Sequence, residues 1–177
     1  AYFPELQFET PETLLGCQQR AQRAKLDSRQ KWLGTYYAQE LKAKKTPEIS
    51  IRWLNETLGY GVFTNRPIKR HAFIGEYTGL VCKQRLFKKI RNYYCFDYTF
   101  VSGTHNSPYL IDGERPGNFI RYINHSDHPN LETSSVLHDG LMHIILYAIQ
   151  EIPAGAQLCY DYGGDYWKKR SKPQLLE

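Results

Sequence analysis

The sequence predicts a mainly β domain with a helical segment in front of it. The 177 residues, of which 41% are hydrophobic, are enough to bury the core of one domain. Before Pro47, apolar residues recur at helical spacing, and after it short runs of β-forming residues alternate with Gly, Pro, Asn and Asp. We therefore divide the chain into a helical flank (1–47), a β-rich domain (48–165) and a short tail (166–177).

The flank is predicted to be helical over residues 10–45. Thr10, Pro11 and Glu12 supply an N-cap, a first-turn proline and an acidic residue near the helix start. Gly34 is expected to break or bend the helix, and residues 42–45 suit a basic last turn. We expect the flank to pack on the main domain rather than to lie on nucleic acid or a membrane.

The β-rich domain is predicted to consist of many short strands and few helices. Residues 142–149 are nearly all apolar, which favours a buried strand, and residues 83–93 are expected to form one short helix. The predicted strands are Glu48–Trp53, Gly61–Asn65, Phe73–Tyr77, Leu80–Cys82, Tyr93–Val101, Tyr109–Ile111, His143–Ile149 and Gln157–Tyr160.

The charge is unevenly distributed along the chain. The net charge is +5, but residues 51–100 carry nine basic and three acidic side chains, whereas residues 101–165 carry two basic and eight acidic ones. A basic first half favours phosphate or acidic partners, and an acidic second half favours a cationic partner.

Several protein classes are not expected. No apolar run approaches the roughly 18 residues that span a bilayer, and acidic residues in the first 15 positions do not suit a secretion signal. The four cysteines contain no CxxC pair, so we expect reduced thiols in the cytosol or nucleus, without a disulfide framework or a zinc site. The chain has no GxSxG serine elbow, and Cys159 has no evident base beside it.

Four short segments concentrate the residues that are able to carry chemistry. They are the glycine pair of Gly59-Tyr60-Gly61, the segment Gly75-Glu76-Tyr77-Thr78-Gly79, the polar cluster Arg121-Tyr122-Ile123-Asn124-His125-Ser126, and Tyr160-Asp161-Tyr162. Each alone is compatible with a strand end or a turn. The histidine spacings match no standard metal site, so no metal is expected.

Taken in order, these segments resemble the SET-domain protein lysine methyltransferases. The resemblance covers about residues 50–165 and is most specific at Asn-His-Ser and Tyr-Asp-Tyr. It implies a SET fold of several small curved sheets, with a C-terminal pseudoknot where these two segments cross. It also implies S-adenosylmethionine as methyl donor, S-adenosylhomocysteine as by-product, and a lysine ε-amine as acceptor.

The resemblance also implies roles for individual residues. Tyr162 is the expected catalytic residue, Tyr77 and Tyr109 are expected to line the lysine channel, and Tyr160 falls where the family sets product multiplicity, which favours mono- or dimethylation. The expected cofactor-binding residues are Gly59, Tyr60, Gly61, Arg121, Asn124, His125, Tyr162 and Trp167. The cysteine-rich zinc segments of many relatives are not present, so Trp167 is expected either to stack on the adenine or to anchor the tail.

The expected partner is a lysine-bearing basic peptide, histone or histone-like, drawn to the acidic second half. The basic stretch 66–91 is expected to contact nucleosomal DNA. The expected location is the nucleus or chromatin, including a host nucleus for a bacterial effector, and otherwise the cytoplasm. Two alternatives stay open, namely a non-catalytic binding module and a nucleic-acid binder; the oligomeric state is left open.

Overall fold

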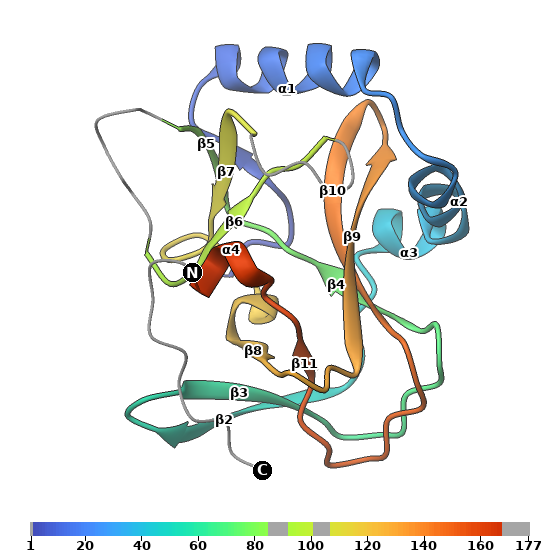
Figure 1. The fold of residues 1–177 in the computed structure, drawn as a ribbon, viewed down its shortest axis with the longest axis vertical. Coiled ribbons are helices and arrows are strands. Elements are labelled where there is room, and N and C mark those ends of the chain that lie inside the picture. The colour runs from blue at the N-terminus through green and yellow to red at the C-terminus, as the bar shows by residue number, and fades with distance from the viewer. Residues whose placement is uncertain (1, 85–91, 101–106, 168–177) are drawn as a thin grey trace. The chain divides into compact units, whose positions relative to one another are not determined.

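The structure is a computed structural model that describes residues 2–84, 92–100 and 107–167 (Figure 1). The helices are α1 (Pro11–Arg23), α2 (Ser28–Tyr36), α3 (Ala38–Ala43), a 3-10 turn (Phe119–Tyr122) and α4 (Gly164–Trp167). The strands are β1 (Gln7–Phe8), β2 (Ile49–Asn55), β3 (Gly59–Thr64), β4 (Phe73–Glu76), β5 (Leu80–Lys83), β6 (Cys95–Asp97), β7 (Tyr109–Asp112), β8 (Asn124–His125), β9 (Leu131–His138), β10 (Leu141–Ala148) and β11 (Cys159–Tyr160).

The mainly β fold with small sheets is confirmed. The strand orders are β1-β5-β7-β6, β4-β10-β9-β11-β8 and β2-β3, and each predicted strand overlaps one of these elements. The helix expected over residues 83–93 falls mostly outside the described residues. No helix in the described ranges is long and apolar enough to cross a membrane.

The flank is helical, but the expected break at Gly34 is wrong. α1 begins as predicted, with the Thr10 hydroxyl accepting a hydrogen bond from the Thr13 N–H. The interruption comes after α1, where Asp27 and Gln30 form a capping box that starts a new helix. Gly34 lies inside α2. A Cβ at this position would stand 2.9 Å from the Leu137 carbonyl oxygen, so glycine is needed here for close packing and not for a break in the helix.

Strand β9 was not predicted, because its polar Thr and Ser residues hide the alternation of a strand. A turn signal next to it was available. Asp139 and Gly140 both have positive φ, at 47° and 77°, and they connect β9 to β10 as a two-residue hairpin loop. Asp-Gly between two apolar-containing runs is a strong hairpin signal, so this pair predicts both strands.

The chain divides into two units, which are described separately. The first contains segments 1–45, 75–121 and 134–146. Its four-stranded sheet pairs β5 antiparallel with β7 and parallel with β1. Its fully buried apolar side chains include Val81, Ile111, Ile120, Met142 and Ile145.

The second unit contains segments 46–74, 122–133 and 147–177. Its hairpin β2–β3 is antiparallel, with Trp53 opposite Tyr60, and β11 runs parallel to β8. Its buried apolar side chains include Val62, Ile123, Leu131, Ile152 and Leu158.

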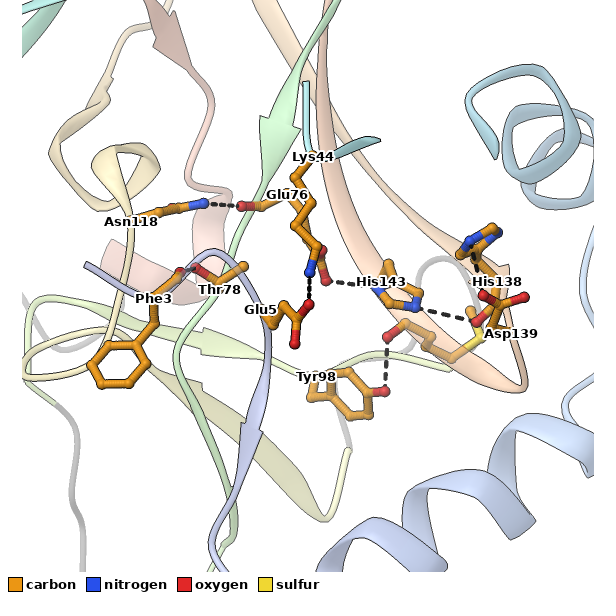
Figure 2. A network of polar contacts seen from close by, with 11 residues as sticks. Phe3, Glu5, Lys44, Glu76, Thr78, Tyr98, Asn118, His138, Asp139 and His143 are labelled. Carbon is orange, nitrogen blue, oxygen red and sulfur yellow. Dashed lines mark hydrogen bonds and ion pairs between the residues drawn. The ribbon is translucent and has the colours of Figure 1, made fainter. Parts of the chain in front are cut away.

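A half-buried histidine and a half-buried carboxylate pair across β10 and β4 of the first unit (Figure 2). His143 Nδ1 lies 2.6 Å from Glu76 Oε1, and Nε2 lies 3.2 Å from the carbonyl oxygen of His138. A carbonyl oxygen only accepts, so Nε2 carries a proton, and protonation of Nδ1 gives the Glu76 carboxylate a charged donor. Burial by itself lowers the pKa of His143, but the hydrogen bond and charge of Glu76, the His138 carbonyl and Asp139 together raise it above its ordinary value.

This pair predicts a pH-dependent stability. Because the pKa of His143 is raised in the folded chain, its contribution is fully present below the unfolded value of about 6.5 and is lost as pH rises through the folded pKa. Between the unfolded and the folded pKa, the free energy of unfolding of the wild type should therefore fall as pH rises. Measured against His143→Gln, the fall is up to about 1.4 kcal/mol per pH unit. Urea unfolding of both proteins from pH 6 to pH 9 measures the difference, and two parallel curves would exclude the effect.

Candidate active site

The site is built where two segments far apart in the sequence lie side by side (Figure 1). β8 pairs parallel with β11, which places Asn124 opposite Cys159 and His125 opposite Tyr160. The Ser126 N–H extends the pairing by donating to the Tyr160 carbonyl at 3.2 Å. The Asn-His-Ser and Tyr-Asp-Tyr segments therefore meet, as the predicted crossing of these segments requires.

Asn130 holds this arrangement together, a role that the sequence analysis did not assign. Its Nδ2 donates to the Gln157 carbonyl at 2.8 Å, and its Oδ1 accepts the Cys159 N–H at 2.9 Å. Its own N–H donates to the Cys159 carbonyl at 3.2 Å. The side chain thus replaces a missing strand partner for the segment that leads into Tyr160. Its position directly after Pro129, near the dense polar cluster, was the available signal.

Asn130→Ala should lower the free energy of unfolding by about 2 kcal/mol, because it leaves the Cys159 N–H and the Gln157 carbonyl without this hydrogen-bond partner in partly buried positions. Asn65→Ala is the matched control, since the Asn65 amide pairs with Ser50 in an exposed position. The control should cost less than about 0.5 kcal/mol. Urea midpoints of the two variants test this, and equal losses would refute the role given to Asn130.

Tyr162 lies at the centre of a cluster of rings. Its ring stands 4.7 Å from Tyr160, 4.7 Å from Tyr166 and 5.9 Å from Trp167, the last with an interplanar angle of only 7°. Its hydroxyl donates a hydrogen bond to the Ile123 carbonyl at 2.7 Å. Since a hydroxyl oxygen also accepts hydrogen bonds, this group is chemically able to accept an N–H from an amine. The cluster therefore presents an oriented acceptor within an apolar aromatic environment.

His125 positions Tyr162 through the backbone. Its buried Nδ1 accepts the Tyr162 N–H at 3.1 Å, so that nitrogen carries no proton and the other ring nitrogen does. Nε2 lies 3.3 Å from Asp127 Oδ1, which suits a donor. The ring also contacts Trp167, with centroids 4.9 Å apart. His125 therefore ties the Tyr162 backbone to β8 and contacts Trp167.

The predicted glycine pair lies on β3, next to the same segment. Gly59 has φ +67°, a conformation that L side chains rarely adopt, and a Cβ on Gly61 would meet Gln157 Nε2 at 2.8 Å. Asn124 Nδ2 donates to the Tyr60 carbonyl at 3.0 Å, which joins β8 to β3. Tyr60 itself is 46% exposed, with its ring edge-on to both Trp53 and Tyr122. The backbone here is thus open to a ligand on one side.

Trp167 carries a polar group that the described residues do not satisfy. Its Nε1 is buried and has no hydrogen-bond partner among them, although its ring packs on Tyr162 and His125. An unpaired buried donor costs free energy that an acceptor on a ligand restores. A flat heterocycle with ring nitrogens, such as adenine, offers both such an acceptor and a face for stacking. The residues present therefore fit a nucleoside-containing ligand.

Three predicted site residues, Tyr77, Tyr109 and Arg121, belong to the first unit. The Tyr77 hydroxyl donates to the Tyr94 carbonyl at 2.5 Å, and its ring contacts Phe96 at 5.1 Å. Tyr109 is buried and its hydroxyl lies against Gly16 of α1. Arg121 Nη1 donates to the carbonyls of Gly113 and Glu114. Their predicted roles in the channel and in cofactor binding stay predictions.

A cysteine nucleophile does not suit the site. Burial raises the pKa of the Cys159 thiol to about 11, so the thiol stays protonated at neutral pH. Asp161 is exposed, and its carboxylate accepts the Gly163 N–H at 2.9 Å in a local turn, which is a structural contact. The chemistry of the site therefore rests on the aromatic cluster and the amides around it.

Comparisons with known proteins agree with this arrangement. Residues 59–163 match the model of the SET domain. The chain is 34% identical over 112 residues to histone-lysine N-methyltransferase ash1 of Drosophila melanogaster, which covers 63% of the chain and 5% of that protein. It is 32% identical over 119 residues to histone-lysine N-methyltransferase NSD3 of Mus musculus, covering 62% and 8%. The chain thus spans less than a tenth of the length of these curated relatives.

Two solved structures share the fold. One is the crystal structure of KRYPTONITE in complex with mCHH DNA, H3(1-15) peptide and SAH, with a TM-score of 0.57 and 28% identity over 68% of this chain and 24% of that one. The other is an active polycomb repressive complex 2 in the stimulated state, with a TM-score of 0.61 and 24% identity over 74% of this chain and 17% of that one. The second, at this identity, shows the fold alone.

Proposed function

Since the chain belongs to the SET-domain family, we propose that it transfers a methyl group from S-adenosylmethionine to the ε-amine of a lysine in a basic protein tail. The observation that carries the proposal is the Tyr162 hydroxyl, oriented by Ile123 within a ring cluster at the crossing of β8 and β11. The named relatives are histone-lysine N-methyltransferases, which supports a histone or histone-like substrate. We assign the activity to residues 48–165, with 1–47 as a flank and 166–177 as a tail.

The donor is proposed to lie against Gly59, Tyr60 and Gly61, with Asn124 and His125 on its other side and Trp167 stacking on its base; Arg121 stays a predicted cofactor-binding residue. The open space at Gly59 and the aromatic ring of Trp167, on which a base can stack, support this placement. When bound, S-adenosylmethionine supplies an electrophilic methyl group on a positively charged sulfur. Asn124 keeps β8 joined to β3, and His125 keeps the Tyr162 backbone in place.

The lysine must reach the site as a neutral amine. With an ordinary pKa of about 10.4, its deprotonation at pH 7 costs about 4 to 5 kcal/mol, and a dry aromatic environment reduces that cost because it disfavours the charged form. The rings of Tyr160, Tyr162 and Trp167 exclude water, and the Tyr162 oxygen accepts an amine N–H so that the nitrogen lone pair is aimed. Tyr77 and Tyr109 are proposed as further channel walls.

We further propose how many methyl groups are transferred and what kind of protein accepts them. Tyr160 is 6% exposed and packs on Tyr162, which supports a crowded site and therefore mono- or dimethylation. The excess of acidic residues in 101–165 supports a basic tail as substrate, and chromatin as the place of action. Contact with nucleosomal DNA through 66–91 stays a prediction, and residues 85–91 of that stretch lie outside the described residues.

Incubation with labelled S-adenosylmethionine and core histones tests the proposal. Label should appear on histone lysines with the wild type and be lost with both Tyr162→Phe and Asn124→Ala. Donor binding without transfer to any basic protein would instead favour the non-catalytic module. Retention of DNA without either property would favour a nucleic-acid binder.

A further inference from the structure

The helical flank exposes an aromatic pair that its own packing does not explain. In α2, Gln30, Leu33 and Gly34 form the buried face. On the opposite side, Trp32 is 58% exposed and Tyr36 is 51% exposed, one helical turn apart. Their rings stack with centroids 4.8 Å apart and an angle of 14°. The edge contact of Tyr36 with the buried Tyr37 fixes the pair in place.

Basic side chains precede this pair in the sequence and are exposed in the structure. Residues 20–36 carry five basic side chains against one carboxylate, an excess of four in a chain whose net charge is +5. The basic residues, all exposed, are Arg20, Arg23, Lys25, Arg29 and Lys31. The single carboxylate, Asp27, is occupied as a helix cap, with Oδ1 accepting the Gln30 N–H at 2.7 Å. Lys25 and Arg29 are four residues apart, so their Cα atoms lie within about 14 Å of each other.

We propose that the surface formed by residues 20–36 binds single-stranded nucleic acid, with phosphates on the basic side chains and a base stacked on the Trp32–Tyr36 pair. This function is separate from methyl transfer and does not depend on it. Exposed aromatic side chains beside a basic track are the combination by which proteins bind single strands with little sequence preference. The charge excess supplies attraction to a phosphate backbone.

The aromatic pair decides between this partner and two others. The carboxylates of an acidic peptide satisfy the basic side chains but are not themselves flat rings for the stack. A nucleic-acid duplex offers phosphates but keeps its base faces inside the helix, so it leaves Trp32 exposed. An unpaired strand supplies both a phosphate and an accessible base in every nucleotide, and RNA and DNA strands share this chemistry.

Fluorescence anisotropy with labelled oligouridylate and oligothymidylate of about 12 nucleotides, a length within the usual single-strand site range, tests the proposal. Trp32→Ala should weaken binding of one or both strands by about 5- to 100-fold, as expected for the loss of one base stack. The triple variant Arg23→Gln, Lys25→Gln, Lys31→Gln should reduce the slope of log affinity against log salt by about 2, since each phosphate contact on a single strand contributes about 0.7. Comparison of the two oligonucleotides distinguishes RNA from DNA.

Trp53→Ala is the matched control, because Trp53 has the same 58% exposure but lies on β2. It should leave strand affinity within twofold, and urea midpoints of both tryptophan variants should match the wild type. Three results would overturn the proposal. The first is no binding of either oligonucleotide at about 50 mM salt. The second is binding of a duplex that is as tight as binding of the single strand and is not weakened by Trp32→Ala, and the third is displacement of the bound oligonucleotide by polyglutamate of equal charge. Each can occur whether or not the chain transfers methyl groups, so the two proposals fail separately.

Discussion

Tyr162→Phe should lower the rate of methyl transfer by about 100- to 1,000-fold, the usual loss when one oriented polar group is removed from a reacting centre. The phenylalanine ring keeps the contacts with Tyr160, Tyr166 and Trp167, so the cluster survives. What is lost is the oxygen that the Ile123 carbonyl orients. Donor binding should stay within about threefold of the wild type, because the variant removes no group assigned to the donor's base or amino end.

The matched control for this variant is Tyr147→Phe. The Tyr147 hydroxyl is also in the second unit and donates to Glu132 at 3.0 Å, so its removal also costs a hydrogen bond. Single-turnover rates with donor in excess compare the two variants. Equal rates for Tyr162→Phe and the wild type would remove Tyr162 from the reacting centre, whereas equal losses in both variants would assign the effect to stability.

Asn124→Ala should weaken binding of S-adenosylhomocysteine by about 10- to 100-fold. The side chain has two assigned tasks: it joins β8 to the Tyr60 carbonyl, and it is proposed to hold the amino group of the donor. Its loss both loosens the segment that carries His125 and removes a polar partner of the ligand. A buried or partly buried hydrogen bond to a charged group is worth about 1.5 to 3 kcal/mol, which corresponds to this range.

Asn118→Ala provides the comparison, because the Asn118 amide also donates to a backbone carbonyl, that of Glu76 at 2.6 Å, but in the first unit. It should lose more stability than Asn124→Ala, because Asn118 is buried and its Oδ1 also accepts the Ile120 N–H, while its donor affinity stays close to that of the wild type. Equilibrium dialysis with labelled donor measures both affinities. A donor affinity unchanged in Asn124→Ala would refute the proposed placement of the donor.

Features of the fold that depend on contacts between residues close in the sequence were predicted, and features that depend on distant contacts were not. Thr10 and Pro11 start α1 through contacts three residues apart, and local patterns predict such features well. The predicted break at Gly34 was wrong because this glycine serves a close approach to Leu137, about a hundred positions away, and local sequence does not reveal such a contact. β9 was missed because its strand character depends on pairing with β10 rather than on alternation.

In the candidate site, too, the residues could be predicted from local motifs, but the long-range contacts that hold them could not. Order and identity of the motifs pointed to Asn124, His125 and Tyr162, and the structure brings these three together with Tyr160 and Trp167. No local pattern indicates how His125 acts, because its acceptance of the Tyr162 N–H exists only after two segments 37 residues apart have crossed. The same holds for Asn130, whose side chain bonds to Gln157 and Cys159, 27 and 29 residues further along the chain.

Calorimetric titration of the purified chain with S-adenosylhomocysteine shows directly whether the second unit binds the methyl donor beside Tyr162. We expect saturable binding of one ligand per chain, weakened by Trp167→Ala as well as by Asn124→Ala. An absence of binding heat for both the by-product and the donor, at several temperatures and with a chain that unfolds cooperatively, would contradict it.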